Sequence, residues 1–288
     1  MKALPDLRPS ILTAALAVAF AGSALAQTAP SPAPAPAAEP AKAEAAAEPA
    51  KPEPDFTFTS NIGLFSQYVF RGVSQTNEKP AVQGGFDLSH KSGFYVGTWA
   101  SNISWIGDAY IPPPGEPGVS SSIEWDFYGG YKGSLPADFG YDLGVLYYWY
   151  PGKFPSGWTS DNTTELYAAL TWKFLSLKYS YSANNNTFGV PDSRGSGYVD
   201  LTASYDVIDK VNDVFGKVTV MGHVGRQVYR GSGNLSYTDW KVGASTEIYG
   251  LTVGIFGTGT NAQDAPYTNI YGKNIAGNQF VGYIQKTF

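Results

Sequence analysis

The sequence predicts an all-β protein, a transmembrane antiparallel up-and-down β-barrel of about 12 strands, and three observations support this prediction. Apolar and polar residues alternate with period two in many segments, so each segment has one apolar and one polar face. Charged residues make up only 15% of the chain, aromatic residues make up 15%, and there are 33 glycines. No apolar segment is long enough to span a bilayer as a helix. Together these features favour a barrel in lipid over a soluble sandwich.

The clearest alternation lies in residues 163–182, TTELYAALTWKFLSLKYSYS. The phase of the alternation changes at Phe174 and Leu175, which predicts two paired strands joined there. With these two residues as the turn, Lys173 pairs with Ser176, and the register of the hairpin follows.

The first 54 residues are predicted to lie outside the barrel. Lys2 and Arg8 precede an apolar run at 11–20 and a small-residue ending at Ala26, as in a secretory signal peptide that is cleaved there. The apolar run is too short for an uncleaved membrane anchor. The next residues are almost wholly Ala, Pro, Glu, Lys, Gln, Thr and Ser, which predicts a disordered periplasmic tether, an inert spacer rather than a partner-binding motif. The predicted organisation is a signal peptide at 1–26, a disordered linker at 27–54 and an outer-membrane β-barrel at 55–288.

Twelve strands are predicted, and even strand numbers are typical of bacterial single-chain barrels. Short turns alternate with long connections, which are expected on the extracellular side; the connection at 208–216 is longer than a periplasmic turn should be. The long connections hold residues 112–118, 151–161, 184–195 and 261–276. The predicted strands are 56–70, 80–90, 93–105, 121–133, 139–150, 162–174, 175–183, 196–207, 217–228, 237–249, 250–260 and 277–288.

Composition and motifs exclude several classes of function. The chain has no cysteine, which excludes disulfides and thiolate metal sites. Its net charge of -5, or -6 once the signal peptide is removed, makes nucleic acid a poor partner. The glycine pairs lack a phosphate-loop ending, and the acidic residues at 209–213 lack the spacing of a calcium loop. We therefore expect no metal, no cofactor and no nucleic acid.

Charged side chains recur on the polar faces of the predicted strands. In a barrel these faces line the lumen. Together with Asp206, the acidic side chains on these faces number nine and the basic ones four, which predicts a weak cation preference. The lumen-lining candidates are Asp87, Glu124, Asp126, Lys132, Asp142, Glu165, Lys173, Lys178, Asp200, Asp239, Lys241 and Glu247.

Histidine and arginine offer weaker signals. His223 shares the parity of Met221 and is expected to face the lumen, but no motif near it supplies the nucleophile that an enzyme would need, so we expect no enzyme. Four arginines fall near the predicted outer strand ends, where they can meet lipopolysaccharide phosphates or narrow a pore mouth. We expect solvated loop side chains instead. These arginines are Arg71, Arg194, Arg226 and Arg230.

Residues 66–105, SQYVFRGVSQTNEKPAVQGGFDLSHKSGFYVGTWASNISW, resemble the opening of the TorF-type porin family of proteobacteria. The similarity extends over the barrel, from about Phe56 to Phe288. It implies an outer-membrane location and a barrel, and it supplies no substrate and no site residues. The matching residues are Tyr68, Arg71, Gly72, Ser74, Gln75, Pro80, Ala81, Gln83, Gly84, Gly85, Ser92, Gly93, Phe94, Tyr95, Gly97, Trp99, Ser101 and Asn102.

We therefore expect a Gram-negative outer-membrane porin that passively conducts small hydrophilic solutes or ions, in contact with outer-membrane lipid and lipopolysaccharide. Its oligomeric state is open. Barrels of about eight strands can be filled by side chains and those of 16 to 18 leave an open channel, so a pore of 12 strands should be narrow and shaped by inward-folding loops. Two alternatives remain: a non-conducting surface or adhesion protein with a plugged lumen and, less favoured, an outer-membrane lipid-modifying enzyme.

Overall fold

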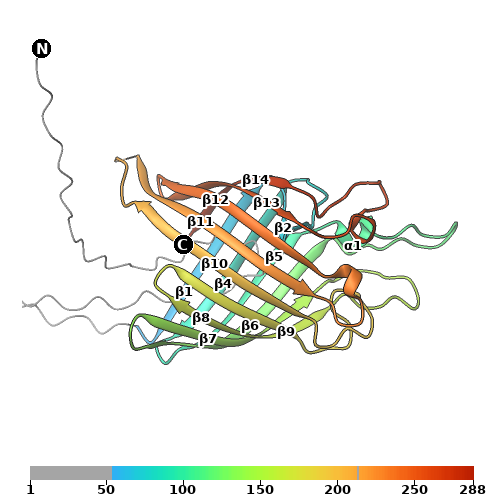
Figure 1. Cartoon of the computed structure of the whole chain (residues 1–288), viewed down its shortest axis with the longest axis horizontal. Coiled ribbons are helices and arrows are strands. Elements are labelled where there is room, and N and C mark those ends of the chain that lie inside the picture. The colour runs from blue at the N-terminus through green and yellow to red at the C-terminus, as the bar shows by residue number, and fades with distance from the viewer. Residues whose placement is uncertain (1–53, 213) are drawn as a thin grey trace, which may run out of the picture.

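The computed structural model describes residues 54–212 and 214–288. Twelve antiparallel strands close into one barrel (Figure 1), which confirms the predicted fold class. Among the described residues, no helix combines the length and apolar character needed to span a bilayer. The predicted signal peptide, and the predicted tether up to residue 53, lie outside the described residues.

Each strand pairs with its neighbours in chain order, and the last strand closes the barrel onto the first. The order matches the predicted strands one for one. Short helical turns α1 (Trp105–Asp108), η1 (Gly233–Leu235) and η2 (Ala265–Tyr267) lie in the connections. The barrel strands are β1 (Phe56–Phe65), β4 (Ala81–His90), β5 (Phe94–Asn102), β6 (Ile123–Leu135), β7 (Phe139–Trp149), β8 (Thr163–Trp172), β9 (Leu175–Ser182), β10 (Gly197–Ile208), β11 (Phe215–Val228), β12 (Tyr237–Ile248), β13 (Leu251–Thr260) and β14 (Gln279–Thr287).

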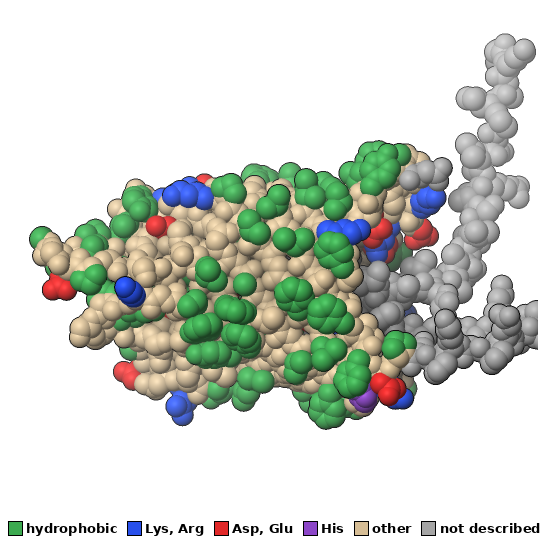
Figure 2. All heavy atoms as spheres, turned by 180° about the vertical axis from the view of Figure 1, so that it is seen from behind, with side chains coloured by type: hydrophobic (Ala, Val, Ile, Leu, Met, Phe, Trp, Pro, Cys, Tyr) green, Lys and Arg blue, Asp and Glu red, His purple; other side chains and the backbone are tan. Residues whose placement is uncertain are grey.

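Most outward-facing side chains of the strands are apolar. Phe58 is 63% exposed, Val242 58% and Ile255 60%. Figure 2 shows such side chains spread over the outer surface, with charged groups gathered toward the two ends of the barrel. Apolar surface costs about 25 cal/mol per Å² in water, so a monomeric soluble protein rarely exposes so much of it. Contact with hydrocarbon removes this cost, and the outer face therefore suits a bilayer.

Short and long connections alternate along the chain, as predicted. One end of the barrel, the short-turn end, holds the turns 91–93, 136–138, 173–174 and 249–250 and the longer connection 209–214. The other end, the long-loop end, holds the remaining connections. Tyr249 and Gly250 have φ of 49° and 72°, and positive φ at both residues of a two-residue turn matches the twist of the strands it joins.

The turn between β8 and β9 lies one residue earlier than predicted. Lys173 and Phe174 form it, so that Thr171, rather than Lys173, pairs with Ser176. Lys173 has φ of 52°, the positive value that tight hairpin turns favour, and the alternation of side chains does not reveal this backbone requirement. Lys173 is exposed, with its Nζ 4.8 Å from the centre of the Trp172 ring. Its prediction as a lumen-lining residue was wrong.

The connection after β1 folds into the barrel. The predicted strand 56–70 ends at Phe65, and a small hairpin of β2 (Val69–Phe70) and β3 (Val73–Ser74) follows. Every residue from 67 to 76 is buried, and we call this segment the plug. Tyr68 and Phe70 share the apolar parity of Phe56 and Phe58, which predicts a lipid-facing side, but they are 0% and 9% exposed.

The plug completes an apolar cluster inside the long-loop half of the barrel. Tyr68, Val69 and Phe70 belong to this cluster, together with Ile106 of α1 and Tyr148 of β7. Phe70 meets the Tyr148 ring edge-on, with 5.8 Å between ring centres. The apolar core of this barrel therefore lies in a part of the lumen that water would fill in an open pore.

Candidate functional site

Most charged side chains predicted for the lumen lie inside the barrel and make it the candidate site. Their outward-facing neighbours along each strand are apolar. Glu247, next to the turn at 249–250, is exposed, whereas the others are buried or partly buried. The buried ones are Glu124, Asp126, Asp142, Glu165, Asp239 and Lys241, and the partly buried ones are Asp87, Lys132, Lys178 and Asp200.

Arg71 lies at the tip of the plug and binds side chains of β8 and β11, on the opposite wall of the barrel. Its Nη1 and Nη2 donate to Glu165 Oε1 and Oε2 at 2.9 and 2.7 Å, and Nη1 also donates to Gln227 Oε1 at 2.8 Å. The side chains of Arg71 and Glu165 are 4% and 3% exposed. Bidentate geometry of this kind offsets much of the cost of burying two charges. The sequence analysis expected a solvated Arg71, and that expectation was wrong.

Aromatic rings and a tight backbone complete the tip of the plug. The Arg71 guanidinium carbon lies 4.2 Å from the centre of the Tyr198 ring. Arg71 and Gly72 have φ of 47° and 78°, and a Cβ at Gly72 would lie 2.5 Å from Thr260 Cγ2 and 2.8 Å from Asp239 Cβ. Glycine is therefore required for this approach. The plug thus reaches across the lumen from the connection between β1 and β4 to β8, β11, β12 and β13.

A set of carboxylates and tyrosines surrounds the plug. Tyr68 and Tyr150 donate to Glu124 at 2.7 and 2.9 Å, and Tyr148 donates to Glu165 at 3.2 Å. Burial and the Glu124 carboxylate raise the pKa of Tyr68 and of Tyr150 well above the usual value. Both hydroxyls therefore stay protonated and act as donors.

The short-turn half of the lumen also holds tyrosines and charged side chains. Tyr95 donates to Asp142 at 2.6 Å and contacts the hydroxyl of Tyr167. Lys178 Nζ lies 4.2 Å from the centre of the Tyr167 ring, and Lys132 Nζ lies 5.2 Å from that of Tyr95. Both lysines are partly exposed. Water can therefore reach these two lysine side chains.

His223 lies inside the barrel between two carboxylates. Its Nε2 is 2.9 Å from Asp239 Oδ2 and 3.0 Å from the Tyr198 hydroxyl, and its Nδ1 is 3.4 Å from Asp200 Oδ2. These contacts link β10, β11 and β12 below the tip of the plug. An imidazole whose two ring nitrogens each face an aspartate suits a structural link.

Several tyrosine rings in the lumen lie flat against glycines of a neighbouring strand. A Cβ at Gly225 would lie 2.0 Å from Tyr198 Oη, and one at Gly144 would lie 2.4 Å from Tyr167 Oη. Any larger residue would displace these rings. The glycines thus leave the space that these tyrosines occupy, including the ring on which Arg71 stacks.

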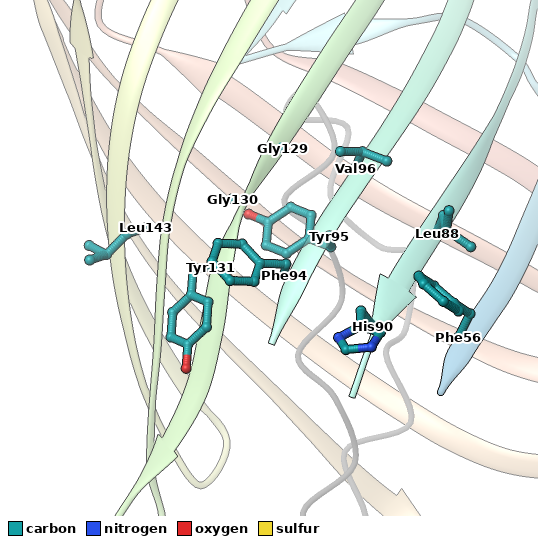
Figure 3. Close-up of a pocket in the computed structure, with 10 residues that line it drawn as sticks. All are labelled: Phe56, Leu88, His90, Phe94, Tyr95, Val96, Gly129, Gly130, Tyr131 and Leu143. Atoms are coloured by element: carbon teal, nitrogen blue, oxygen red, sulfur yellow. The ribbon is translucent and has the colours of Figure 1, made fainter. Parts of the chain in front are cut away.

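A groove on the outside of the barrel is separate from this lumen site (Figure 3). The Phe94 and Tyr131 rings meet edge-on across it, with 4.9 Å between their centres. Its walls are mostly outward-facing apolar side chains near the short-turn end, so the groove faces lipid. It is lined by Phe56, Leu88, His90, Phe94, Tyr95, Val96, Gly129, Gly130, Tyr131 and Leu143.

Comparison with known proteins gives one family and several barrels of the same fold. Residues 46–288 match the family described as "Bacterial protein of unknown function (Gcw_chp)". No curated protein matches the sequence.

Three solved structures illustrate the likeness in fold. The KdgM porin has 9% identity and a TM-score of 0.48, with 80% of this chain and 99% of that chain covered. The NanC porin has 12% identity and a TM-score of 0.42, covering 80% and 98%. LpxR from Salmonella typhimurium has 8% identity and a TM-score of 0.41, covering 80% and 99%. Likenesses this distant carry no argument about activity.

Proposed function

The chain belongs to the Gcw_chp family of bacterial proteins of unknown function, and we propose that it is a narrow outer-membrane channel for small hydrophilic solutes or ions, closed by its own plug. One observation carries the proposal: a barrel with an apolar outer face encloses a charged interior, and the connection after β1 folds into that interior. We also propose the TorF-type assignment, for which the quoted residues 66–105 are the support.

Insertion into the outer membrane of a Gram-negative bacterium is part of the proposal. The predicted signal peptide supports export, and the apolar outward side chains support contact with lipid. At the long-loop end, the exposed Arg194 and Arg230 are the proposed contacts for lipopolysaccharide phosphates.

A weak cation preference is part of the proposal. With the exposed Lys173 and Glu247 left out and the buried Arg71 added, the lumen set together with Asp206 holds eight acidic and four basic side chains. A single-sign excess inside a low-dielectric wall attracts the opposite charge.

Liposome swelling and bilayer recordings test this function. We expect slow swelling with small sugars, amino acids and salts, and a reversal potential that favours cations across a salt gradient. A reversal potential that favours anions would discard the cation preference. No swelling with any solute, together with no current at any voltage, would discard the channel.

A non-conducting surface protein is the second candidate, and the apolar packing of the plug favours it. Tyr68, Val69 and Phe70 lie in the core cluster, as a permanent stopper would. Ile111 and Tyr271, in the long loops, are 71% and 65% exposed and could contact a partner. Absence of current, combined with altered host or phage contact after trimming residues 112–118 or 261–276, would favour this candidate.

We propose no enzymatic activity. The contacts of His223 support this view, because Asp200 and Asp239 engage its two ring nitrogens. A His223→Ala variant should leave the lipid composition of the outer membrane unchanged, and altered acyl chains in that variant would contradict the proposal.

A further inference from the structure

Asp126 lies on the inner face of β6, and we call the buried region between this face and the plug the chamber. Trp99 of β5 and Tyr148 of β7 are its cross-strand partners. Tyr68 of the plug packs edge-on against Trp99, with 5.4 Å between ring centres. Glu124 lies two residues away on the same face of β6. Asp126 is 0% exposed, so aromatic side chains and the plug screen it from water.

The chamber holds more negative than positive charge. The charge of Asp126 interacts with those of Glu124 and Glu165. Arg71 pairs with Glu165, and the hydroxyls of Tyr68 and Tyr150 donate to Glu124. Neither carboxylate oxygen of Asp126 has a hydrogen-bond partner among the described residues.

A buried carboxylate without a partner is strongly unfavourable, so a proton or a cation must neutralise it. Within residues 54–212 and 214–288, no three His, Cys, Asp or Glu side chains converge closely enough to hold a metal ion. Calcium takes six to eight oxygen ligands, often several of them carboxylates, and the chamber does not supply such a set. A monovalent cation needs fewer charged ligands than calcium, and one carboxylate together with neutral oxygen atoms can bind it. Tyrosine hydroxyls can supply these oxygens while they donate elsewhere.

We propose that Asp126 binds one monovalent metal cation, sodium or potassium, in the chamber that the plug covers. The ion neutralises the carboxylate and links β6 to the docked plug. This site does not depend on conduction, because a barrel that passes no current can still hold the ion.

Thermal unfolding of the full chain in detergent micelles tests the site. The salts are NaCl, KCl and N-methylglucamine chloride at equal ionic strength. We expect a higher Tm in NaCl or KCl than in the organic salt. The difference should vanish in Asp126→Asn and persist in Glu116→Gln, which alters an exposed loop carboxylate. Equal Tm values of the wild-type protein in all three salts would overturn the proposal, as would the same salt difference in Asp126→Asn.

Crystal diffraction of the wild-type protein tests the site even if Asp126→Asn fails to fold. Wild-type crystals grown in NaCl, and others soaked in a thallium salt as a potassium surrogate, should show an ion bonded to Asp126 in at least one of the two. A carboxyl group with no ion in both crystals would mean that it is protonated or hydrated, and the proposal would fail.

Discussion

Arg71→Ala tests how firmly the plug is held. The substitution removes the bidentate contact with Glu165 at 2.9 and 2.7 Å, the bond to Gln227 and the stacking on Tyr198. It also leaves the Glu165 carboxylate buried and unpaired. Breaking a buried ion pair from one side costs about 3–5 kcal/mol. If the whole cost falls on docking, the ratio of undocked to docked plug rises roughly a hundredfold to several-thousandfold, at about 1.4 kcal/mol per factor of ten.

The matched control is Arg226→Ala, because Arg226 is an exposed arginine whose Nη1 donates to Thr238 Oγ1 at 3.2 Å. An exposed contact contributes about 0–1 kcal/mol. Urea unfolding in lipid vesicles gives the free energies, and bilayer recordings give the open fraction. Adding Glu165→Gln to Arg71→Ala should restore part of the stability, because the orphaned charge is gone. Equal unfolding free energies for the two arginine variants, with currents unchanged from wild type, would refute the role given to Arg71.

Three further predictions address the wall, a loop and the outer face. Gly225→Ala should lower the free energy of unfolding by about 1–3 kcal/mol, because its Cβ would lie 2.0 Å from Tyr198 Oη. Gly222→Ala should lower it much less, because a Cβ there would have no atom within 4 Å. Urea unfolding compares the two variants, and equal losses would contradict the packing described for Gly225. Burial raises the pKa of Asp161 to about 6, so its contribution to stability is present below its usual pKa and is lost as pH rises through about 6. Circular dichroism melts at several pH values should show this slope flattened in Asp161→Asn, and an unchanged slope would exclude Asp161 as its source. Val242→Lys should cost about 2–4 kcal/mol in vesicles if its site on β12 lies near the bilayer midplane. No measurable cost would mean that water covers that face.

The twelve strands could be predicted because lipid imposes a simple pattern. A side chain that faces hydrocarbon must be apolar, and its neighbours along the strand face the opposite way, so the alternation marks both the strands and their inner faces. Alternating turn lengths gave the up-and-down order. The turn at Lys173 was missed because its start depends on positive φ, which period-two alternation does not record.

The plug could not be predicted from the alternation of apolar and polar residues. Tyr68 and Phe70 continue the apolar parity of β1 and so resemble a lipid-facing strand, although the β1–β4 pairing ends at Phe65 and Ala81. One local signal was present: Arg71–Gly72 between the apolar residues Phe70 and Val73 is compatible with a tight turn that has positive φ. The partners of Arg71 lie 94 and 156 residues away in the chain, and one sequence cannot bring such residues together.

Single-channel conductance of a plug-replaced barrel tests the central claim most directly. Residues 67–76 would be exchanged for a Gly/Ser linker of the same length, and the variant compared with wild type in the same bilayer and salt. We expect the variant to show a steady conductance much larger than that of the wild-type protein, because the lumen then holds water where Tyr68, Phe70 and Arg71 had packed. A correctly folded variant that conducts no more than wild type would contradict the claim that the plug closes this barrel.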